Sequence, residues 1–306
     1  GCILQNQTPG RRRSSADKNV FGSVAVHIAD VHRAGWQSAV ADSFAGYRTV
    51  DRKATAQGSQ VGQGQVVSPH HVDRGGRRAV AAGGAAALKA AGIEVVAGVG
   101  QEEAEYANRA WLTKIIKGRP FITWKVAATL DGKVAALDGT SKWITNEASR
   151  ADVQKVRRSV DAIMVGTQTV IADDPHLVPR DGKEGANPLR IVCGTQELPK
   201  GAQVFDSAAP TKVIASKDLE VIAAELLATG VNHILLESGP TLASAMLYAC
   251  MLDELMIYQG PALLGAGKNF VADLGAVTLD HAMSMPRVST ETFGDDVKSV
   301  YRITNE

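Results

Sequence analysis

A glutamate at the end of a predicted buried strand is the clearest chemical signal in the sequence. The predicted strand 233–237 reads His-Ile-Leu-Leu-Glu and ends in Glu237, and 238–242 reads Ser-Gly-Pro-Thr-Leu. Glycine permits a tight turn, and proline suits the first helical position, where its missing N–H costs nothing. The N-terminus of the next helix then offers N–H groups and a positive dipole end to a phosphate. An ordinary turn between strand and helix is the alternative.

A lysine and a run of small side chains mark a second segment. Lys125 precedes Val-Ala-Ala-Thr-Leu at 126–130, and the pair Asp131-Gly132 is a turn signal. Small side chains there would let a flat ring lie against the backbone. Close packing of a helix on the sheet explains the same residues equally well.

Two separated arginines form the third signal. Arg157 lies on a predicted helix, 147–160, and Arg180 follows Asp-Asp-Pro-His-Leu at 173–177. Arginines on a helix surface are usually solvated, so either residue alone means little. If both guanidinium groups converge, they can hold a phosphomonoester, because arginine recognises oxyanions through forked hydrogen bonds.

The elements that must position these groups alternate regularly from residue 119 onward. The predicted strands are 121–127, 162–166, 189–193, 212–215, 233–237, 254–258 and 298–304, and the predicted helices are 147–160, 219–228 and 241–250. This alternation predicts an α/β domain with a mixed, mostly parallel sheet covered on both faces. Before a break at 117–120, helices are expected at 85–91 and 102–112 and a strand at 93–99.

The first 80 residues differ in composition from the rest. They hold 11 Lys and Arg against 5 Asp, no Glu and a single leucine, Leu4. Short apolar runs such as 24–26 occur, but neither a helical nor a strand period persists. This composition predicts a weakly structured or disordered segment.

Several classes of function find no support in the sequence. It has no Gly-x-Ser-x-Gly, no His-Glu-x-x-His and no apolar run long enough to span a membrane. Its three cysteines lie far apart, and the start of the chain is unlike a signal peptide, so we expect a cytoplasmic protein. No nucleic-acid partner is expected, because the basic N-terminal segment lacks aromatic platforms and a groove-binding helix.

Taken in order, five motifs resemble the reductase domain of the bifunctional riboflavin-biosynthesis deaminase–reductase family. They are the small-residue strand ending in Leu-Asp-Gly-Lys (126–133), Ser-Lys-Trp-Ile-Thr (141–145), Gly-x-x-Thr-Val-x-Ala-Asp-Asp-Pro-x-Leu (166–177), Glu-Ser-Gly-Pro-Thr-Leu (237–242), and Asp-Glu-Leu (253–255) followed by Pro-x-Leu-Leu-Gly (261–265). One departure is Val178-Pro179 before Arg180, where proline could redirect the loop.

The resemblance implies a dihydrofolate-reductase-like fold and an NADPH-dependent reduction of 5-amino-6-(5-phosphoribosylamino)uracil at ribose C1′. By matching position, the cofactor site would include Ala127, Trp143, Thr169, Asp173, Thr195, Gly239, Pro240, Thr241, Leu242, Ala243, Ser244 and Ala245. The substrate site would include Ser141, Arg157, Leu177, Arg180 and Glu237. Lys125, Asp173 and Glu237 are the catalytic candidates, with proton transfer unassigned among them. A homo-oligomer formed through the reductase domain is expected.

In this family a zinc-dependent, cytidine-deaminase-like domain precedes the reductase domain. We expect residues 1–81 to be a degenerate or disordered remnant of it, 82–118 its C-terminal part and 119–306 the reductase domain. Residues 5–81 contain no cysteine and no glutamate, so zinc cannot be bound with the family's ligands and deaminase activity is predicted absent. We therefore expect no metal site.

Translation out of frame between two in-frame stretches would explain the composition of residues 5–81, and a genuine degenerate domain is the competing account. Under the first account the natural enzyme is intact and bifunctional, with its N-terminal sequence misread here. Another NADPH-dependent reductase with the same fold is a further alternative.

Overall fold

The computed structural model describes residues 100–182 and 185–304, residues 90 and 92, and two short strands, β1 (Val24–Val26) and β2 (Val95–Ala97). The chain divides into two compact units between Arg109 and Ala110. Each unit is described separately. In the first part of the chain, β1 pairs with β2 in antiparallel register.

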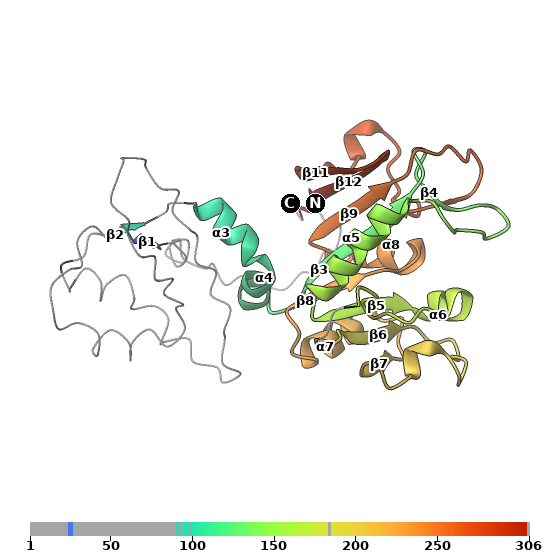
Figure 1. The fold of residues 1–306 in the computed structure, drawn as a ribbon, viewed down its shortest axis with the longest axis horizontal. Coiled ribbons are helices and arrows are strands. Elements are labelled where there is room, and N and C mark those ends of the chain that lie inside the picture. Colours follow the sequence, from blue (N-terminus) through green and yellow to red (C-terminus); the bar gives the residue numbers. More distant parts are fainter. Residues whose placement is uncertain are drawn as a thin grey trace. The chain divides into compact units, whose positions relative to one another are not determined.

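An eight-stranded sheet forms the centre of the unit that begins at Ala110 (Figure 1). In spatial order its strands are β11 (Arg287–Phe293), β12 (Asp296–Arg302), β9 (Glu254–Gln259), β3 (Phe121–Ala128), β8 (His233–Leu236), β5 (Ala162–Gly166), β6 (Leu189–Cys193) and β7 (Thr211–Ile214). The run from β9 to β7 is parallel, whereas β12 and β11 are antiparallel. The mixed, mostly parallel sheet is thereby confirmed. Parallel strands place their carboxyl ends at one edge, where ligands of α/β proteins bind.

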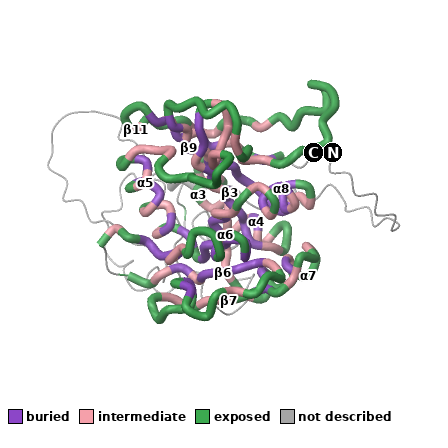
Figure 2. Tube along the Cα trace, turned by 90° about the vertical axis from the view of Figure 1, so that its right-hand side faces the viewer, coloured by how far each residue is buried: buried purple, intermediate pink, exposed green. Residues whose placement is uncertain are grey.

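Helices cover both faces of this sheet. The helices α7 (Leu219–Ala228) and α8 (Pro240–Tyr248) pack on one face, where Ile222 and Met246 join the main apolar core. The helices α5 (Glu147–Arg158) and α6 (Thr167–Asp173) pack on the other, through Val153 and Val170. Buried residues accordingly concentrate in the strands of the sheet (Figure 2).

The start of α5 is fixed by side chains from two elements. Asn146 caps the helix by accepting a hydrogen bond from the Ser149 N–H at 2.9 Å. Asp296 of β12 accepts hydrogen bonds from the Asn146 N–H and the Ser149 hydroxyl, at 2.7 and 2.6 Å. A cap of this kind contributes about 1 kcal/mol, and here it also sets the axial position of every α5 side chain.

The predicted helix 102–112 is wrong as a single element. The chain forms α3 (Gln101–Ala107) and α4 (Arg109–Lys117), and Asn108 ends the first by turning its side-chain amide back to the Ala104 carbonyl, at 2.8 Å. The predicted break after residue 117 is confirmed.

Among the described residues of the unit that begins at Ala110, one α-helix and three strands were not predicted. They are α6, β11, β4 (Lys133–Ala135) and β10 (Lys268–Asn269). The edge strand β11 exposes most of its side chains and therefore lacks an apolar alternation. The two-residue β10 is too short for any period. Three further predictions lie mostly outside the described residues: the helix 85–91 apart from residue 90, the strand 93–99 apart from β2, and the weakly structured segment 1–80 apart from β1.

Two predicted motifs meet at the loop that follows β9. Asp131 accepts hydrogen bonds from the Gly265 and Leu264 N–H groups at 2.7 and 3.1 Å. The Thr129 hydroxyl, which also donates to Asp131, is the main cause that lowers the pKa of this carboxyl to about 2. Desolvation opposes the shift, and the two N–H groups add to it. The Leu-Asp-Gly turn thus holds the Pro-x-Leu-Leu-Gly segment in place as a carboxylate.

Candidate functional site

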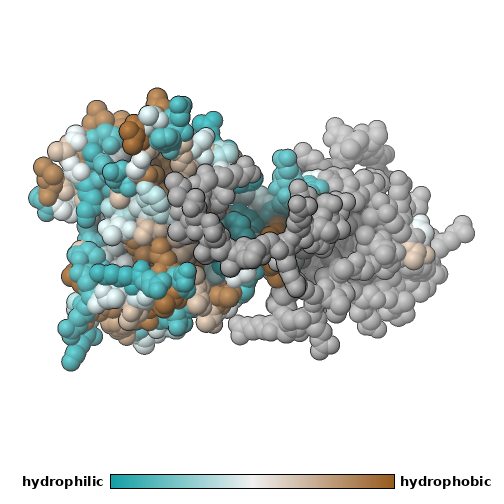
Figure 3. Space-filling model, turned by 180° about the vertical axis from the view of Figure 1, so that it is seen from behind, coloured by the Kyte–Doolittle hydropathy of each residue, from teal (hydrophilic) through white to brown (hydrophobic). Residues whose placement is uncertain are grey.

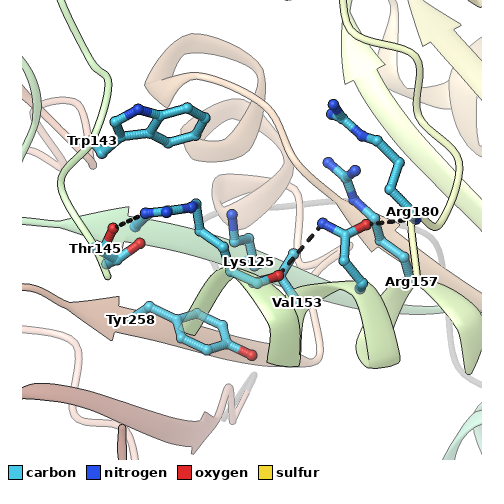
Figure 4. A pocket seen from close by; sticks show the side chains of 10 residues that line it. Lys125, Trp143, Thr145, Val153, Arg157, Arg180 and Tyr258 are labelled. Atoms are coloured by element: carbon cyan, nitrogen blue, oxygen red, sulfur yellow. Dashed lines mark hydrogen bonds between the residues drawn. The ribbon is translucent and has the colours of Figure 1, made fainter. Parts of the chain in front are cut away.

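A cavity of about 170 Å³ lies between β3, β9, α5 and two loops (Figure 4). It is lined by Lys125, Ala127, Trp143, Thr145, Arg150, Val153, Gln154, Arg157, Arg180 and Tyr258. Lys125 and Ala127 face it because alternate residues of β3 point to the same side, while Trp124 points into the core on the other. The cavity therefore brings together strand residues and α5 residues that are far apart in sequence.

Arg157 and Glu237 form a forked ion pair beside this cavity. The Arg157 Nε and Nη2 atoms each donate to one Glu237 oxygen, both at 2.7 Å. Both side chains are nearly buried, with exposed fractions of 10% and 11%. Burial opposes ionisation of Glu237, but Arg157, with further help from Lys125 and Arg180, lowers its pKa to about 2. Glu237 is thus a permanent carboxylate at neutral pH.

The third nitrogen of this arginine, Nη1, is buried and has no hydrogen-bond partner among the described residues. An unpaired buried donor of a charged group is costly, so an acceptor brought by a ligand would stabilise it. Arg157 therefore holds Glu237 through Nε and Nη2 and offers Nη1, with its two N–H bonds, to a bound anion.

Lys125 differs from the surrounding arginines because it can lose its charge. Burial lowers the pKa of its ammonium group, and Arg157 lowers it further, while Glu237 acts in the opposite direction and is outweighed. A lysine with a lowered pKa can give up and recover a proton, which arginine cannot do in proteins. Among the catalytic candidates predicted from the sequence, Lys125 is the one placed in the cavity wall with this property.

Arg180 reaches the same cavity from the loop after α6. Its side chain is exposed and forms no ion pair with the part of the chain that the structure describes. The preceding Val178 and Pro179 are buried, so the proline does not turn the loop away from the cavity. Arg157 and Arg180 thus line one cavity (Figure 4).

Trp143 forms an outer wall of the cavity together with a residue that the sequence analysis missed. The Arg150 guanidinium lies over the Trp143 ring at 4.4 Å from its centroid, and it donates to the Thr145 carbonyl at 2.5 Å. Trp143 remains 72% exposed, which leaves its ring available to a ligand. Arg150 precedes Arg157 by seven residues, two helical turns, so the helical period could have placed it on the same face.

Tyr258 is the second missed residue, and it forms part of the floor. Its hydroxyl donates to Asp152 Oδ2 at 2.8 Å, and the Lys298 ammonium donates to the same oxygen at 2.9 Å. Burial, and then Asp152, raise the pKa of Tyr258, which keeps the phenol protonated. No local motif marks this residue, because its position depends on the pairing of β9 with β3.

Three strand ends pack closely near the start of α8. A side chain at Gly166 would contact Ser238 and Leu242, at 3.4 and 3.8 Å. Gly194 has a φ of +135°, and a side chain there would meet the Thr167 hydroxyl at 2.5 Å. The carboxyl ends of β5, β6 and β8 are therefore closely packed, with glycine required at Gly194.

The predicted cofactor residues are distributed unevenly around this edge. Gly239 and Thr241 are exposed at the start of α8, and among the described residues no side chain caps that helix. Thr195 and Asp173 are exposed and Thr169 is half-buried. Pro240, Leu242 and Ala245 are also half-buried, whereas two members of the set point inward: Ala243 is fully buried, and the Ser244 hydroxyl accepts the Ala272 N–H at 2.9 Å.

Ser141, Leu177 and Asp173 are among the predicted site residues that do not line the cavity. Ser141 is exposed on the loop before Trp143. Leu177, 1% exposed, packs in the core beneath α5 and α6, so its side chain supports the Arg180 loop. Asp173 lies at the last position of α6.

Among the described residues no three His, Cys, Asp or Glu side chains could hold a metal ion, and no helix could span a membrane. Residues 5–81 lie outside this description apart from β1.

The unit that begins at Ala110 matches a known family along most of its length. The family model described as the RibD C-terminal domain matches residues 120–299. The riboflavin biosynthesis protein RibD of Mycobacterium tuberculosis is 42% identical over 223 residues, covering 71% of this chain and 65% of that protein. RibD of Aquifex aeolicus is 34% identical over 233 residues, covering 69% and 65%. The chain thus spans slightly less than two thirds of these relatives.

Solved structures agree with the sequence matches. Acinetobacter baumannii RibD aligns with a TM-score of 0.64 and 30% identity over 73% of this chain and 69% of that one. A Thermotoga maritima protein described as a diaminohydroxyphosphoribosylaminopyrimidine deaminase/5-amino-6-(5-phosphoribosylamino)uracil reductase aligns with a TM-score of 0.63 and 27% identity, covering 72% and 66%. These matches confirm the expected reductase-domain fold. The chain belongs to the family of the RibD C-terminal domain.

Proposed function

We propose that this protein catalyses the NADPH-dependent reduction of 5-amino-6-(5-phosphoribosylamino)uracil to its ribitylamino product. The observation that carries the proposal is the cavity in which Arg157, Arg180 and Lys125 meet beside Glu237. The Thermotoga maritima relative is described as acting as a reductase on this substrate.

The charges of the cavity suit a phosphorylated substrate. Arg150, Arg157, Arg180 and Lys125 line it, and Glu237 offsets one positive charge. With Lys125 as an ammonium, these five groups carry a net charge of +3. This excess of positive charge favours a phosphomonoester, which carries about −1.5 to −2 at neutral pH. Arg180 and the free Nη1 of Arg157 are the donors that would hold the phosphate. Fixing the phosphate positions ribose C1′ for reaction.

The proton in this reaction is assigned to Lys125. As the bond between C1′ and the ring oxygen breaks, that oxygen must gain a proton. Glu237, with a pKa of about 2, cannot supply it at neutral pH. The lowered pKa of Lys125 makes its ammonium a better acid than an ordinary lysine.

The cofactor would lie along the carboxyl ends of β5, β6 and β8. NADPH supplies the hydride for C1′ when bound. The uncapped start of α8 fits a pyrophosphate, because Gly239 has open space at its Cα and the Thr241 and Leu242 N–H groups lie in the first turn. Trp143, whose ring is exposed, and Ala127 both line the cavity, so a flat cofactor ring would lie against them. Thr169, Asp173 and Thr195 remain proposed cofactor residues, and Ser141 and Leu177 proposed substrate residues.

The proposal extends to the rest of the chain. Three statements remain predictions: the division into 1–81, 82–118 and 119–306, the absence of deaminase activity and of its zinc, and a cytoplasmic location. A homo-oligomer is supported by exposed apolar side chains at Leu137, Leu263, Val277 and Leu279. On the face in Figure 3, hydrophobic and hydrophilic areas alternate in the part of the chain that is described.

Substituting Arg180 tests the proposal. We expect the purified protein to oxidise NADPH in the presence of the phosphoribosylamino substrate, and Arg180→Ala to raise KM for that substrate at least about tenfold, since a charged hydrogen bond contributes about 1.5–3 kcal/mol. KM for NADPH should stay within about twofold. Arg287→Ala, an exposed arginine on the edge strand β11, is the matched control. An unchanged substrate KM in Arg180→Ala would contradict the phosphate assignment.

A second candidate function is another reductase of the same fold acting on a different phosphorylated substrate. It is favoured by the fact that the cavity identifies a phosphate more clearly than a pyrimidine. This second function would be supported if a sugar phosphate, but not its unphosphorylated form, stimulated NADPH oxidation and the pyrimidine compound did not.

A further inference from the structure

The helix α5 presents two side chains to the loop that carries Arg180. Gln154 and Arg158 are four residues apart and so lie on one face of the helix, next to the Arg157 position. Arg157 is buried and locked by Glu237, whereas Arg180 is exposed on a loop. A pair of guanidinium groups can hold one phosphate only if the loop is fixed relative to the helix.

The first contact is at Arg180 itself. Its backbone N–H donates to the Gln154 Oε1 atom at 3.0 Å, and Gln154 also lines the cavity. The other end of the same amide donates to the Arg150 carbonyl at 3.4 Å, which orients the oxygen toward the loop. The amide therefore joins the helix to the Arg180 backbone and leaves the guanidinium free for a ligand.

The second contact is one residue further along the loop. Arg158 Nη2 donates to Asp181 Oδ1 at 2.7 Å, and the two side chains are 23% and 13% exposed. Arg158 Nη1 lies 3.5 Å from Asn187 Oδ1, at the far end of the same loop. On the other side of Arg180, the chain is held by the buried Leu177 and Val178.

We propose that Gln154 and the Arg158–Asp181 pair are positioning residues that hold Arg180 at the distance from Arg157 that an anionic group requires. The inference rests on the proposed function in naming that group as the substrate phosphate. It assigns to α5 a role in substrate recognition beyond its own arginine at position 157. The residues act through Arg180 and need not touch the substrate.

A near-isosteric change removes the first contact. Gln154→Met keeps the length of the side chain but cannot accept the Arg180 N–H. We expect KM for the phosphorylated substrate to rise about three- to tenfold, with kcat and KM for NADPH within about twofold. The matched control is Lys155→Met, the neighbouring residue on α5, which is 71% exposed. It should behave as wild type.

A double-mutant cycle separates positioning from direct binding. In an Arg180→Ala background, Gln154→Met should have no further effect on KM, because the group that it positions is gone. If the two effects multiply instead, Gln154 contacts the substrate itself and the proposal is overturned.

For the second contact, Asp181→Arg should raise KM for the phosphorylated substrate. Combining it with Arg158→Asp should restore most of the lost affinity. Absence of recovery in a folded double variant counts against the pair.

Binding of inorganic phosphate distinguishes failure of this inference from failure of the proposed function. Titration calorimetry with phosphate needs no turnover. If wild type binds phosphate, and Gln154→Met and Arg180→Ala weaken it by similar factors while Lys155→Met does not, the positioning role stands even for a different substrate. Equal phosphate affinity in wild type, Gln154→Met and Arg180→Ala would overturn it. Equal melting temperatures of these variants exclude a loss of folding as the cause.

Discussion

At the scale of single residues, the site depends on two side chains of the same cluster having opposite protonation behaviour. Glu237 is held as a carboxylate by Arg157, while Lys125 is destabilised as an ammonium by burial. Pairs of titratable groups whose pKa values are shifted by their surroundings often identify acid and base roles. Here Glu237 provides a fixed negative charge, and Lys125 provides the proton that can be transferred.

Replacing Lys125 tests its proton role. Lys125→Met should lower kcat by about 10²-fold or more, because proton transfer by a positioned group contributes that much, and should leave KM for NADPH nearly unchanged. Lys125→Arg should not restore activity, since arginine keeps its proton. The pH profile of kcat in wild type should show a basic limb below the ordinary lysine pKa of 10.5 that the variant lacks. Lys200→Met, an exposed lysine, is the control. Full activity in Lys125→Met would refute the assignment.

Glu237 predicts a specific acid dependence of stability. Its folded-state pKa of about 2 lies below its ordinary value of 4.5, so the ionised group stabilises the fold above pH 4.5 and this contribution is lost as the pH falls toward 2. The shift corresponds to about 3 kcal/mol. In urea unfolding at several pH values, Glu237→Gln should be less stable than wild type at pH 7. The two curves should converge between pH 4.5 and 2, and a constant difference would contradict this account.

At the scale of elements, the packed strand ends near α8 require glycine at position 194. A side chain there would lie 2.5 Å from the Thr167 hydroxyl and would adopt a φ of +135°. Gly194→Ala should therefore destabilise the fold by about 1–3 kcal/mol and raise KM for NADPH more than KM for the substrate. Gly201→Ala, with open space at its Cα, is the matched control and should be neutral. Chemical unfolding and steady-state kinetics measure both effects, and a neutral Gly194→Ala would show that this turn does not shape the cofactor site.

The sequence predicted the elements that have an apolar period and missed those that do not. Strands such as β5, fully buried between two helix layers, read as continuous apolar runs and were located correctly. The helix α6 has only Thr167 and Val170 buried, so its seven residues show no helical stripe. The edge strand β11 exposes both faces and was missed for the same reason.

The site was predictable where the motifs carry local chemistry. Arg157, Arg180 and Lys125 were named from the sequence and line one cavity. The ion-pair partner of Arg157 could not be inferred, because Glu237 follows the strand β8, 80 residues later in the chain. Tyr258 depends likewise on strand pairing, which is a property of the fold rather than of any segment.

At the scale of the whole molecule, the compact unit begins before the predicted domain boundary at residue 119. The helix α4 is tied to this unit by Lys114, which donates to the Gly230 carbonyl, and by Lys117, 2.9 Å from Asp253. Arg119 also pairs with Asp253, at 2.6 Å. The predicted boundary therefore cuts through a set of contacts that stabilises the unit.

Two truncations test where the reductase unit starts. A chain beginning at residue 110 should keep the reductase activity and melting temperature of the full protein. A chain beginning at residue 119 should melt a few degrees lower, because it loses the α4 contacts while the active cavity is unchanged. Equal melting temperatures would show that α4 is dispensable, and loss of activity in the longer fragment would show that earlier residues contribute to the site.

Transfer of an isotope label tests the central claim most directly. Full-length protein is incubated with NADPH deuterated at the transferable position and with 5-amino-6-(5-phosphoribosylamino)uracil, and the product is analysed by mass spectrometry and NMR. The account predicts one NADPH oxidised per product formed, with the deuterium at ribityl C1′. Absence of NADPH oxidation, or label at any other position, would contradict it.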